Sequence, residues 1–313
     1  MRPLSKELKV ELIIIGDEIL NGRVSDLNGP FLAQTLFKKG LLLNNITICG
    51  DSYKEIENTI NHSINRSQLI FITGGLGPTE DDKTKQCLAK IFNKKLIASE
   101  AGEKVTKENY SRYGKEWILG QNNYNFIPED FVPQQNFNGL APGLIYTIKE
   151  KGKVQKLLIA PGVPREFQIM LEKVFLPELI NEKICPDLAK KQVVIKTQGI
   201  PEEQIFTEAY PSLWNDFSVY GKVSSLPQIS GVNIIVSLFD DIHYENALKA
   251  MQALVAETQL NEHVWQYGDL SLPELIVKKC TEKSITFSFS ESCTGGLSSS
   301  KITNVPGSSS VFE

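Results

Sequence analysis

The sequence has no long apolar run. The first one, from Val10 to Ile15, is followed at once by glycine and acidic residues. It is too short for the core of a secretory signal peptide, and no window approaches the roughly 20 apolar residues that a membrane helix needs. We therefore expect a soluble cytoplasmic protein without a membrane partner.

Cysteine and histidine are also scarce. The five cysteines include no CxxC pair, and the three histidines, His62, His243 and His263, have no metal-ligand spacing. A disulfide framework or a zinc knuckle is therefore not expected, and a reducing cytoplasm fits this composition.

The chain carries no strong excess of either charge. It has 33 basic and 37 acidic residues, which gives a net charge of -4. Such a near-balance provides no field that would gather nucleic acid. We expect no nucleic-acid partner, so a phosphate ligand would have to be held locally by backbone amides, a few cations or a metal.

The N-terminal part has the pattern of a doubly wound α/β domain. Strands are predicted at Val10–Ile15, Asn45–Cys49 and Leu69–Thr73, each followed by a helical pattern, the third from near Asp82. Three such units imply right-handed crossovers in a parallel sheet, whose ligands bind beyond the carboxyl ends of the strands.

The remaining pattern predicts two further units. With 313 residues and 41% hydrophobic content, the chain has material for two or three cores. We predict domains at residues 1–175, 176–267 and 268–313, and a functional loop at Gly120–Pro142. Strands are expected at Phe217–Val223 in the second domain and Ile285–Phe289 in the third.

The segment TGGLGPTEDDKT, from Thr73 to Thr84, is the strongest local signal. Its three glycines, Gly74, Gly75 and Gly77, follow a buried strand, so successive amides can form an anion-binding nest. The acids at 80–82 would repel a bare phosphate, which favours a bridging cation. In the alternative, the segment is a turn in which Asp81 or Asp82 caps the next helix.

More acids fall at the same predicted sheet edge. Asp17 and Glu18 follow the first strand and Asp51 the second. Clustered carboxylates are unfavourable unless a cation offsets them, although each could merely cap its helix. A rigid Pro161–Pro164 turn opens another helix there, and Arg165 and Glu166 in its first turn could meet phosphate and metal or remain solvated.

Five runs carry a family resemblance. GDEILNGRVSDLN, TGGLGPTEDDKT, NGLAPG and APGVPREF resemble the N-terminal, molybdopterin-binding-like domain of the CinA (competence/damage-inducible) family, and FSFSESCTGGLSSSKITNVPGSSSVF resembles the start of its nicotinamide-nucleotide amidase domain. The resemblance implies a three-layer α/β/α fold, then a small KH-like α+β domain and the start of a second α/β domain.

The resemblance also implies an activity, metal-dependent hydrolysis of a nucleoside diphosphate derivative such as ADP-ribose. With the residue patterns above, it predicts a Mg²⁺, Mn²⁺, Co²⁺ or Ni²⁺ cofactor, with K⁺ as a possible addition, a nucleotide or pterin-phosphate ligand and a homodimer. The predicted catalytic residues are Asp51 and Asp82, with Ser292 as the amidase nucleophile. Substrate-binding residues are expected at Asn28, Gly74, Gly75, Gly77, Thr79, Gly162, Pro164 and Arg165, and metal ligands at Asp17, Glu18, Asp81 and Glu166.

Two other functions remain open, a non-catalytic pterin- or nucleotide-binding module and molybdopterin adenylyl transfer. The sequence departs from the family pattern at Leu140, where threonine is usual, and at Gly29, where a small polar residue is usual. The printed chain ends at Glu313, before the lysine and tyrosine that activate the family's amidase serine. We therefore expect no amidase activity, and a segment after about Leu272 that is either poorly ordered or prone to aggregation.

Overall fold

The computed structural model describes residues 8–150, 153–185, 191–229, 231–239 and 241–313. Contacts divide the chain into two compact units, Met1–Lys190 and Lys191–Glu313. The first unit extends past the domain end predicted at residue 175, because Leu176 and Leu179 pack into its core. Among the described residues, no helix is both long enough and apolar enough to cross a bilayer.

The first unit is built on a six-stranded sheet with the order β2-β1-β3-β8-β7-β6. The strands are β1 (Val10–Ile15), β2 (Leu43–Cys49), β3 (Leu69–Thr73), β6 (Val132–Gln134), β7 (Gly143–Glu150) and β8 (Lys153–Ala160). The first four strands in this order are parallel, and β7 and β6 run antiparallel to their neighbours. The chain leaves β1 for β2 on one side and returns to β3 on the other, which confirms the predicted topology and creates a switch point between β1 and β3.

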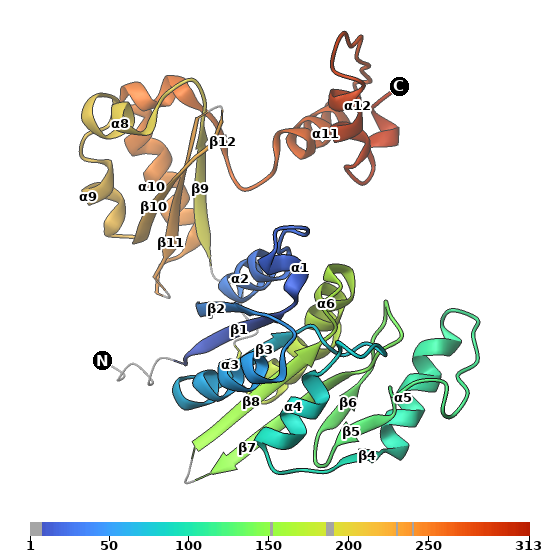
Figure 1. Ribbon diagram of the computed structural model, residues 1–313. Helices are drawn as coiled ribbons and strands as arrows, with labels where there is room; N and C mark the ends of the chain where they lie inside the picture. The colour runs from blue at the N-terminus through green and yellow to red at the C-terminus, as the bar shows by residue number, and fades with distance from the viewer. Residues whose placement is uncertain (1–7, 151–152, 186–190, 230, 240) are drawn as a thin grey trace. The chain divides into compact units, whose positions relative to one another are not determined.

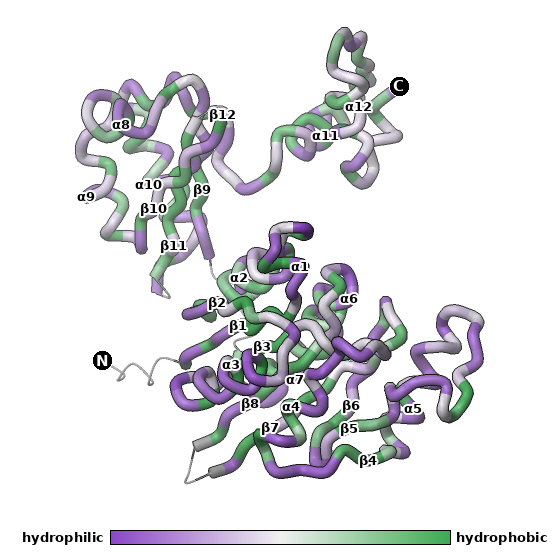
Figure 2. The backbone as a smooth tube through the Cα atoms, viewed as in Figure 1, coloured by the Kyte–Doolittle hydropathy of each residue, from purple (hydrophilic) through white to green (hydrophobic). Residues whose placement is uncertain are grey.

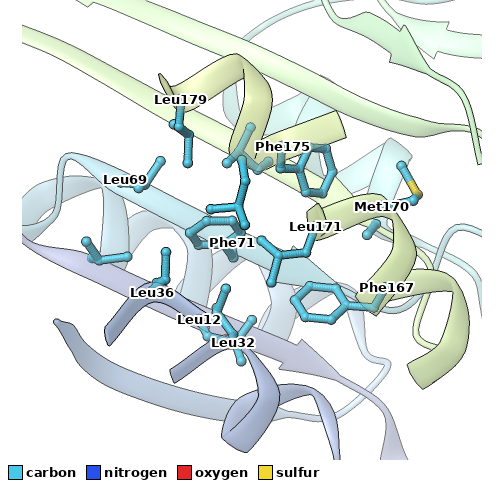
Figure 3. Close-up of a cluster of buried hydrophobic side chains, with 14 of the residues drawn as sticks. Leu12, Leu32, Leu36, Leu69, Phe71, Phe167, Met170, Leu171, Phe175 and Leu179 are labelled. Carbon is cyan, nitrogen blue, oxygen red and sulfur yellow. The ribbon is translucent and has the colours of Figure 1, made fainter. Parts of the chain in front are cut away.

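Helices cover both faces of this sheet (Figure 1). Successive residues of a strand point to opposite faces, so Leu12 packs with α2 (Asn28–Lys38) and α6 (Pro164–Met170), whereas Ile13 packs with α3 (Tyr53–Arg66) and α4 (Thr84–Ile91). On the α2 side, Figure 3 shows Phe71 at the centre of the buried cluster, beside Phe175 from the π-helix Leu171–Phe175. The predicted three-layer arrangement is therefore confirmed.

The segment between α4 and β7 contains more structure than predicted. It holds β4 (Leu96–Ala98), α5 (Glu100–Ser111), β5 (Phe126–Pro128) and β6. The expected loop at Gly120–Pro142 therefore includes two short strands. They escaped prediction because each has only three residues, too few to show alternation, and each contains a proline.

The second unit begins with a four-stranded antiparallel sheet in the order β10-β11-β9-β12. Its elements are β9 (Gln192–Thr197), α8 (Glu202–Gln204), the π-helix Ile205–Ala209, α9 (Leu213–Ser218), β10 (Gly221–Pro227), β11 (Val232–Leu238), α10 (Tyr244–Ala256), the 3-10 helix Gln259–His263 and β12 (Val264–Tyr267). The apolar run of β9 is green in Figure 2. The KH-like assignment stays a prediction.

The strand predicted at Phe217–Val223 is wrong. Phe217 lies in the helix α9, because Leu213 and Phe217 are one helical turn apart and both are buried. The strand β10 begins only at Gly221, whose backbone lies so close to Ser237 that an added Cβ would be 2.2 Å from its carbonyl oxygen.

The last segment contains helices rather than a sheet: α11 (Leu272–Lys283), α12 (Leu297–Thr303) and a 3-10 helix at Ser308–Ser310. The strand predicted at Ile285–Phe289 is reduced to a single bridge between Phe287 and Phe312. A small apolar cluster around Val277, Ile302 and Val311 holds these pieces together.

A buried carboxylate fixes the start of β1 against α3. Glu11 is 3% exposed. It accepts hydrogen bonds from Arg66 Nε at 2.6 Å, Ser63 Oγ at 2.8 Å and Ser67 Oγ at 2.6 Å. Burial raises the pKa of Glu11, but the hydrogen bonds from Arg66, Ser67 and Ser63 outweigh burial and hold the pKa below its usual value.

Glu11→Gln should lower the free energy of unfolding by about 1–3 kcal/mol at pH 7, because glutamine retains one of the two acceptor oxygens. A lowered pKa means that the carboxylate stabilises the fold above its unfolded pKa and that this stability is lost as pH falls through the folded pKa. Urea unfolding at several pH values should therefore show that the difference in free energy of unfolding between wild type and Glu11→Gln becomes smaller as the pH falls. Glu103→Gln, which removes the charge of an exposed carboxylate paired with Lys107, is the control. If the difference in free energy of unfolding between wild type and Glu11→Gln did not change with pH, the stabilising role of the charged Glu11 carboxylate would be contradicted.

Candidate functional site

A pocket of about 720 Å³ lies where the parallel strands end. It is lined by Gly16 after β1, Asp51 after β2, Gly74 after β3 and Pro161 after β8. This is the sheet edge at which the sequence placed the site. Because Asp51 and Asp82 line the same pocket, the predicted convergence of these distant residues is met.

Buried hydrogen bonds join the strand ends beneath the pocket. Asn28, which is 4% exposed, donates through Nδ2 to Thr73 Oγ1 at 3.1 Å and to the Gly162 carbonyl at 2.9 Å. The Thr73 hydroxyl donates in turn to the carbonyl of Pro161 at 2.9 Å. Asn28 Oδ1 is buried without a hydrogen-bond partner among the described residues. Since Asn28 lines the pocket, an N–H or O–H group of a ligand could satisfy this oxygen.

The glycines after β3 shape the loop as predicted. Gly74 has φ +108°, and a Cβ there would lie 2.1 Å from the carbonyl oxygen of Ile15. Gly75 has φ +67°, and its carbonyl accepts from the amide of Thr84 at 3.2 Å. Within the described part of the chain, the amides of Gly75 and Leu76 donate no hydrogen bond. Both residues line the pocket, so two donors remain for an anion.

Asp82 closes this loop rather than capping a helix. Its carboxylate accepts from the amide of Gly77 at 2.8 Å, and from the amide and hydroxyl of Thr79 at 2.9 and 2.6 Å. The following helix α4 begins at Thr84, with Lys83 at its N-cap and no capping side chain. The alternative in which Asp81 or Asp82 caps the helix is therefore wrong.

Two reciprocal hydrogen bonds connect Asp17, which follows β1, with Asp51, which follows β2. The amide of Asp17 donates to Asp51 Oδ2 at 3.0 Å, and the amide of Asp51 donates to Asp17 Oδ1 at 3.3 Å. Burial raises the pKa of Asp51. The charges of Asp17, Glu18 and Asp81 raise it further, against the lowering effect of the Asp17 amide. Like charges thus crowd this side of the pocket.

Glu166, in the first turn of α6, also lines the pocket. Asn136 Nδ2 donates to its Oε2 at 2.6 Å. The carboxylate packs over Gly139, where a Cβ would lie 2.0 Å from Oε2. Burial raises the pKa of Glu166, although the bond from Asn136 lowers it.

The structure brings together most of the predicted site residues. The pocket is lined by Glu18, Asn28, Asp51, Gly74, Gly75, Gly77, Asp81, Asp82, Gly162, Pro164 and Glu166. Three predicted residues of the first unit do not line it: Asp17 supports Asp51, Thr79 supports Asp82, and Arg165 is exposed on α6. Arg165 is therefore not placed to contact a phosphate in this pocket.

The predicted metal ligands do not form a complete protein site. Among the described residues, no group of three or more His, Cys, Asp or Glu side chains could hold a metal ion. A divalent cation is often held by one or two carboxylates together with substrate phosphates and water. Only such an open site, completed by a ligand, fits the carboxylates of this pocket.

Sequence reasoning missed the outer wall of the pocket. Tyr113, Lys115 and Tyr124 line it, yet none lies in a recognisable motif. The loop that carries them is held by Lys85, which is 4% exposed and donates through Nζ to the carbonyl of Asn123 at 2.7 Å. Burial lowers the pKa of Lys85 to about 8, although the charge of Asp82 acts to raise it.

Ser292 belongs to the second unit. Its Oγ lies 3.7 Å from Cys293 Sγ. Cys293 has φ +66°, a left-handed conformation that is uncommon for a residue with a side chain.

Comparisons with known proteins agree with this architecture. The family described as "Probable molybdopterin binding domain" matches residues 11–181. A CinA-like protein of Chlorobium phaeobacteroides is 32% identical over 307 residues, which cover 97% of this chain and 71% of that protein. The chain belongs to the CinA family.

Two further CinA proteins are similar to this chain. A CinA-like protein of Kosmotoga olearia is 32% identical over 310 residues, 97% of this chain and 72% of that protein. The solved structure of the protein CinA, of unknown function, from Thermoplasma acidophilum has 30% identity and a TM-score of 0.48, and the match covers 57% of this chain and 99% of that one. The "CinA C-terminal domain" family matches residues 269–313.

The two departures from the CinA pattern both lie near the pocket. Leu140 lines it. The amide of Gly29 donates to Asp26 Oδ1 and Oδ2 at 3.1 Å each, and a Cβ at Gly29 would lie 2.5 Å from Oδ2. Any larger residue here therefore requires Asp26 to move.

Asp82→Asn should weaken ADP binding by about tenfold to a hundredfold, because the amide group leaves donors of the loop without an acceptor. The melting temperature should fall by only a few degrees, since the loop lies at the surface of the unit. Calorimetric titration and thermal melting would measure both quantities, with Asp130→Asn as a control at an exposed carboxylate paired with Lys94. Unchanged affinity in a strongly destabilised variant would show that Asp82 serves the fold alone.

Proposed function

We propose that the pocket of the first unit binds a nucleoside diphosphate derivative such as ADP-ribose and hydrolyses its phosphoanhydride bond with a divalent cation. The observation that carries this proposal is the pairing of two features in one pocket. Unbonded amides at Gly75 and Leu76 offer donors to phosphate oxygens, and carboxylates beside them offer ligands to a cation.

The charges of the pocket favour a cation-assisted reaction. Six of its lining residues are acidic: Glu18, Asp26, Asp51, Asp81, Asp82 and Glu166. A diphosphate would be repelled by them unless its charge were offset. We assign Glu18 and Asp81, both close enough to Asp51 to raise its pKa, as the residues that would hold the cation. Bound there, a divalent cation would neutralise the diphosphate and polarise a phosphoryl oxygen.

The protein's own residues would position the reacting groups. The amides of Gly75 and Leu76 bind the phosphate, and Asn28 Oδ1 accepts a hydrogen bond from the ligand. Asp51, whose carboxylate is held by the amide of Asp17, accepts the proton of the attacking water. The water oxygen forms the new bond to phosphorus, and the bridging oxygen leaves with the other phosphate. The products are a nucleoside monophosphate and a sugar phosphate.

The purified 313-residue protein should release AMP and ribose 5-phosphate from ADP-ribose with Mg²⁺, Mn²⁺, Co²⁺ or Ni²⁺, with or without K⁺, and should not do so after chelation. Asp51→Asn should reduce kcat by about a hundredfold or more, whereas Asp130→Asn should match wild type. Product release would be followed by chromatography. Turnover that is unchanged in Asp51→Asn would remove Asp51 from the mechanism.

A second candidate is a binding module for a pterin phosphate. The match to a molybdopterin-binding family favours a pterin ligand. Binding of molybdopterin without turnover of ADP-ribose would support this module, and formation of adenylylated molybdopterin after addition of ATP would support adenylyl transfer.

We also propose that Ser292 is not activated for amidase chemistry in this chain. Its neighbour Glu291 already accepts from Thr294 Oγ1 at 2.6 Å and from the amides of Ser298 and Ser299 at 3.0 and 2.9 Å. The side-chain bonds of Ser299 and Thr294, followed by these amides, lower the pKa of Glu291 to about 2. A carboxylate of such low basicity is a poor general base for a serine hydroxyl.

The 313-residue chain should therefore release no ammonia from nicotinamide mononucleotide. A coupled ammonia assay would measure this, with Ser292→Ala as the background control. Deamidation by wild type that disappears in Ser292→Ala would contradict the proposal.

A further inference from the structure

The outer wall of the pocket carries an unassigned cation. Among the described residues that line the pocket, Lys115 has the single positively charged side chain, whereas six lining residues are acidic. Neither the loop Thr73–Thr84 nor the helix α6 adds a second cationic side chain to the pocket lining, because Arg165 on α6 does not line the pocket.

The backbone of Lys115 is held in place by hydrogen bonds, and its side chain is exposed. The helix α5 ends in a left-handed turn at Gly114, with φ +64°, and the amide of Lys115 donates back to the carbonyl of Tyr110 at 3.1 Å. This six-to-one bond is typical of a Schellman motif. The structure therefore fixes the backbone from which the lysine extends.

The chain after Lys115 is equally constrained. Trp117 is 3% exposed, packs with Tyr110 and Tyr124, and donates through Nε1 to Asn122 Oδ1 at 3.0 Å. Farther along, Lys85 binds the carbonyl of Asn123. Because Lys85 lies at the start of α4, directly after the phosphate loop, the lysine-bearing loop is anchored beside the amides that would bind phosphate.

We propose that Lys115 binds the phosphate of the ligand and selects anionic over neutral nucleotides. This inference rests on the proposed function, because it requires a phosphate ligand in the pocket. The ammonium group of Lys115 donates hydrogen bonds to phosphate oxygens. The amides of Gly75 and Leu76, in the loop after β3, donate to other oxygens of the same phosphate. A charge-assisted hydrogen bond of this kind is stronger than a neutral one.

Calorimetric titrations with ADP and with adenosine, both in the presence of Mg²⁺, test the inference. Lys115→Ala should weaken ADP binding by about tenfold to a hundredfold and leave adenosine binding unchanged. Lys115→Arg should retain most of the ADP affinity, since the charge is kept. Wild type should also lose ADP affinity more steeply with added salt than Lys115→Ala does, because salt screens an exposed charge.

Lys107→Ala is the matched control, because Lys107 lies on α5, the helix that leads into the turn before Lys115, but pairs with Glu103 and does not line the pocket. It should bind ADP as wild type does. Equal ADP affinity in wild type and Lys115→Ala would overturn the role of Lys115 but would leave the proposed function standing. If wild type bound neither ADP nor ADP-ribose, both this inference and the proposed function would be overturned, so the two failures are distinguishable.

Discussion

The pocket depends on the buried hydrogen bonds that join the ends of β3 and β8 to the start of α2. Asn28 at the start of α2 reaches Thr73 on β3 and the Gly162 carbonyl after β8. These groups are shielded from water, so breaking one of the bonds would leave another buried polar group unpaired. The strand ends are consequently held in one arrangement, and the loops that line the pocket begin from fixed points.

Close backbone packing follows from this junction. A Cβ at Gly162 would lie 3.3 Å from the Cα of Gly74, so the turns after β3 and β8 approach each other almost without intervening side chains. Their proximity leaves the amides of Gly75 and Leu76 at the pocket while Asp82 holds the far end of the loop. The acidic side chains and Lys115 line the pocket around these turns.

Much of this arrangement could be predicted from the sequence, because buried parallel strands and the glycines after them leave strong local signals. The strands Val10–Ile15 and Leu69–Thr73 have their predicted bounds. Prediction failed where tertiary packing decides: Phe217 fits a strand by composition but pairs with Leu213 on a helix. Lys115 was missed because its place in the pocket follows from a helix end and a buried tryptophan distant from every motif.

The unpaired Oδ1 of Asn28 also bears on discrimination between ligands. Folding removes this oxygen from water without giving it a partner among the residues that the structure describes, so the penalty is present before any ligand arrives. A ligand with a correctly placed donor relieves that penalty, whereas an otherwise identical ligand with a methyl group or an ether oxygen there leaves it in place. Sites built around a buried polar atom reject an analogue that lacks the matching group far more strongly than apolar walls reject a change in size.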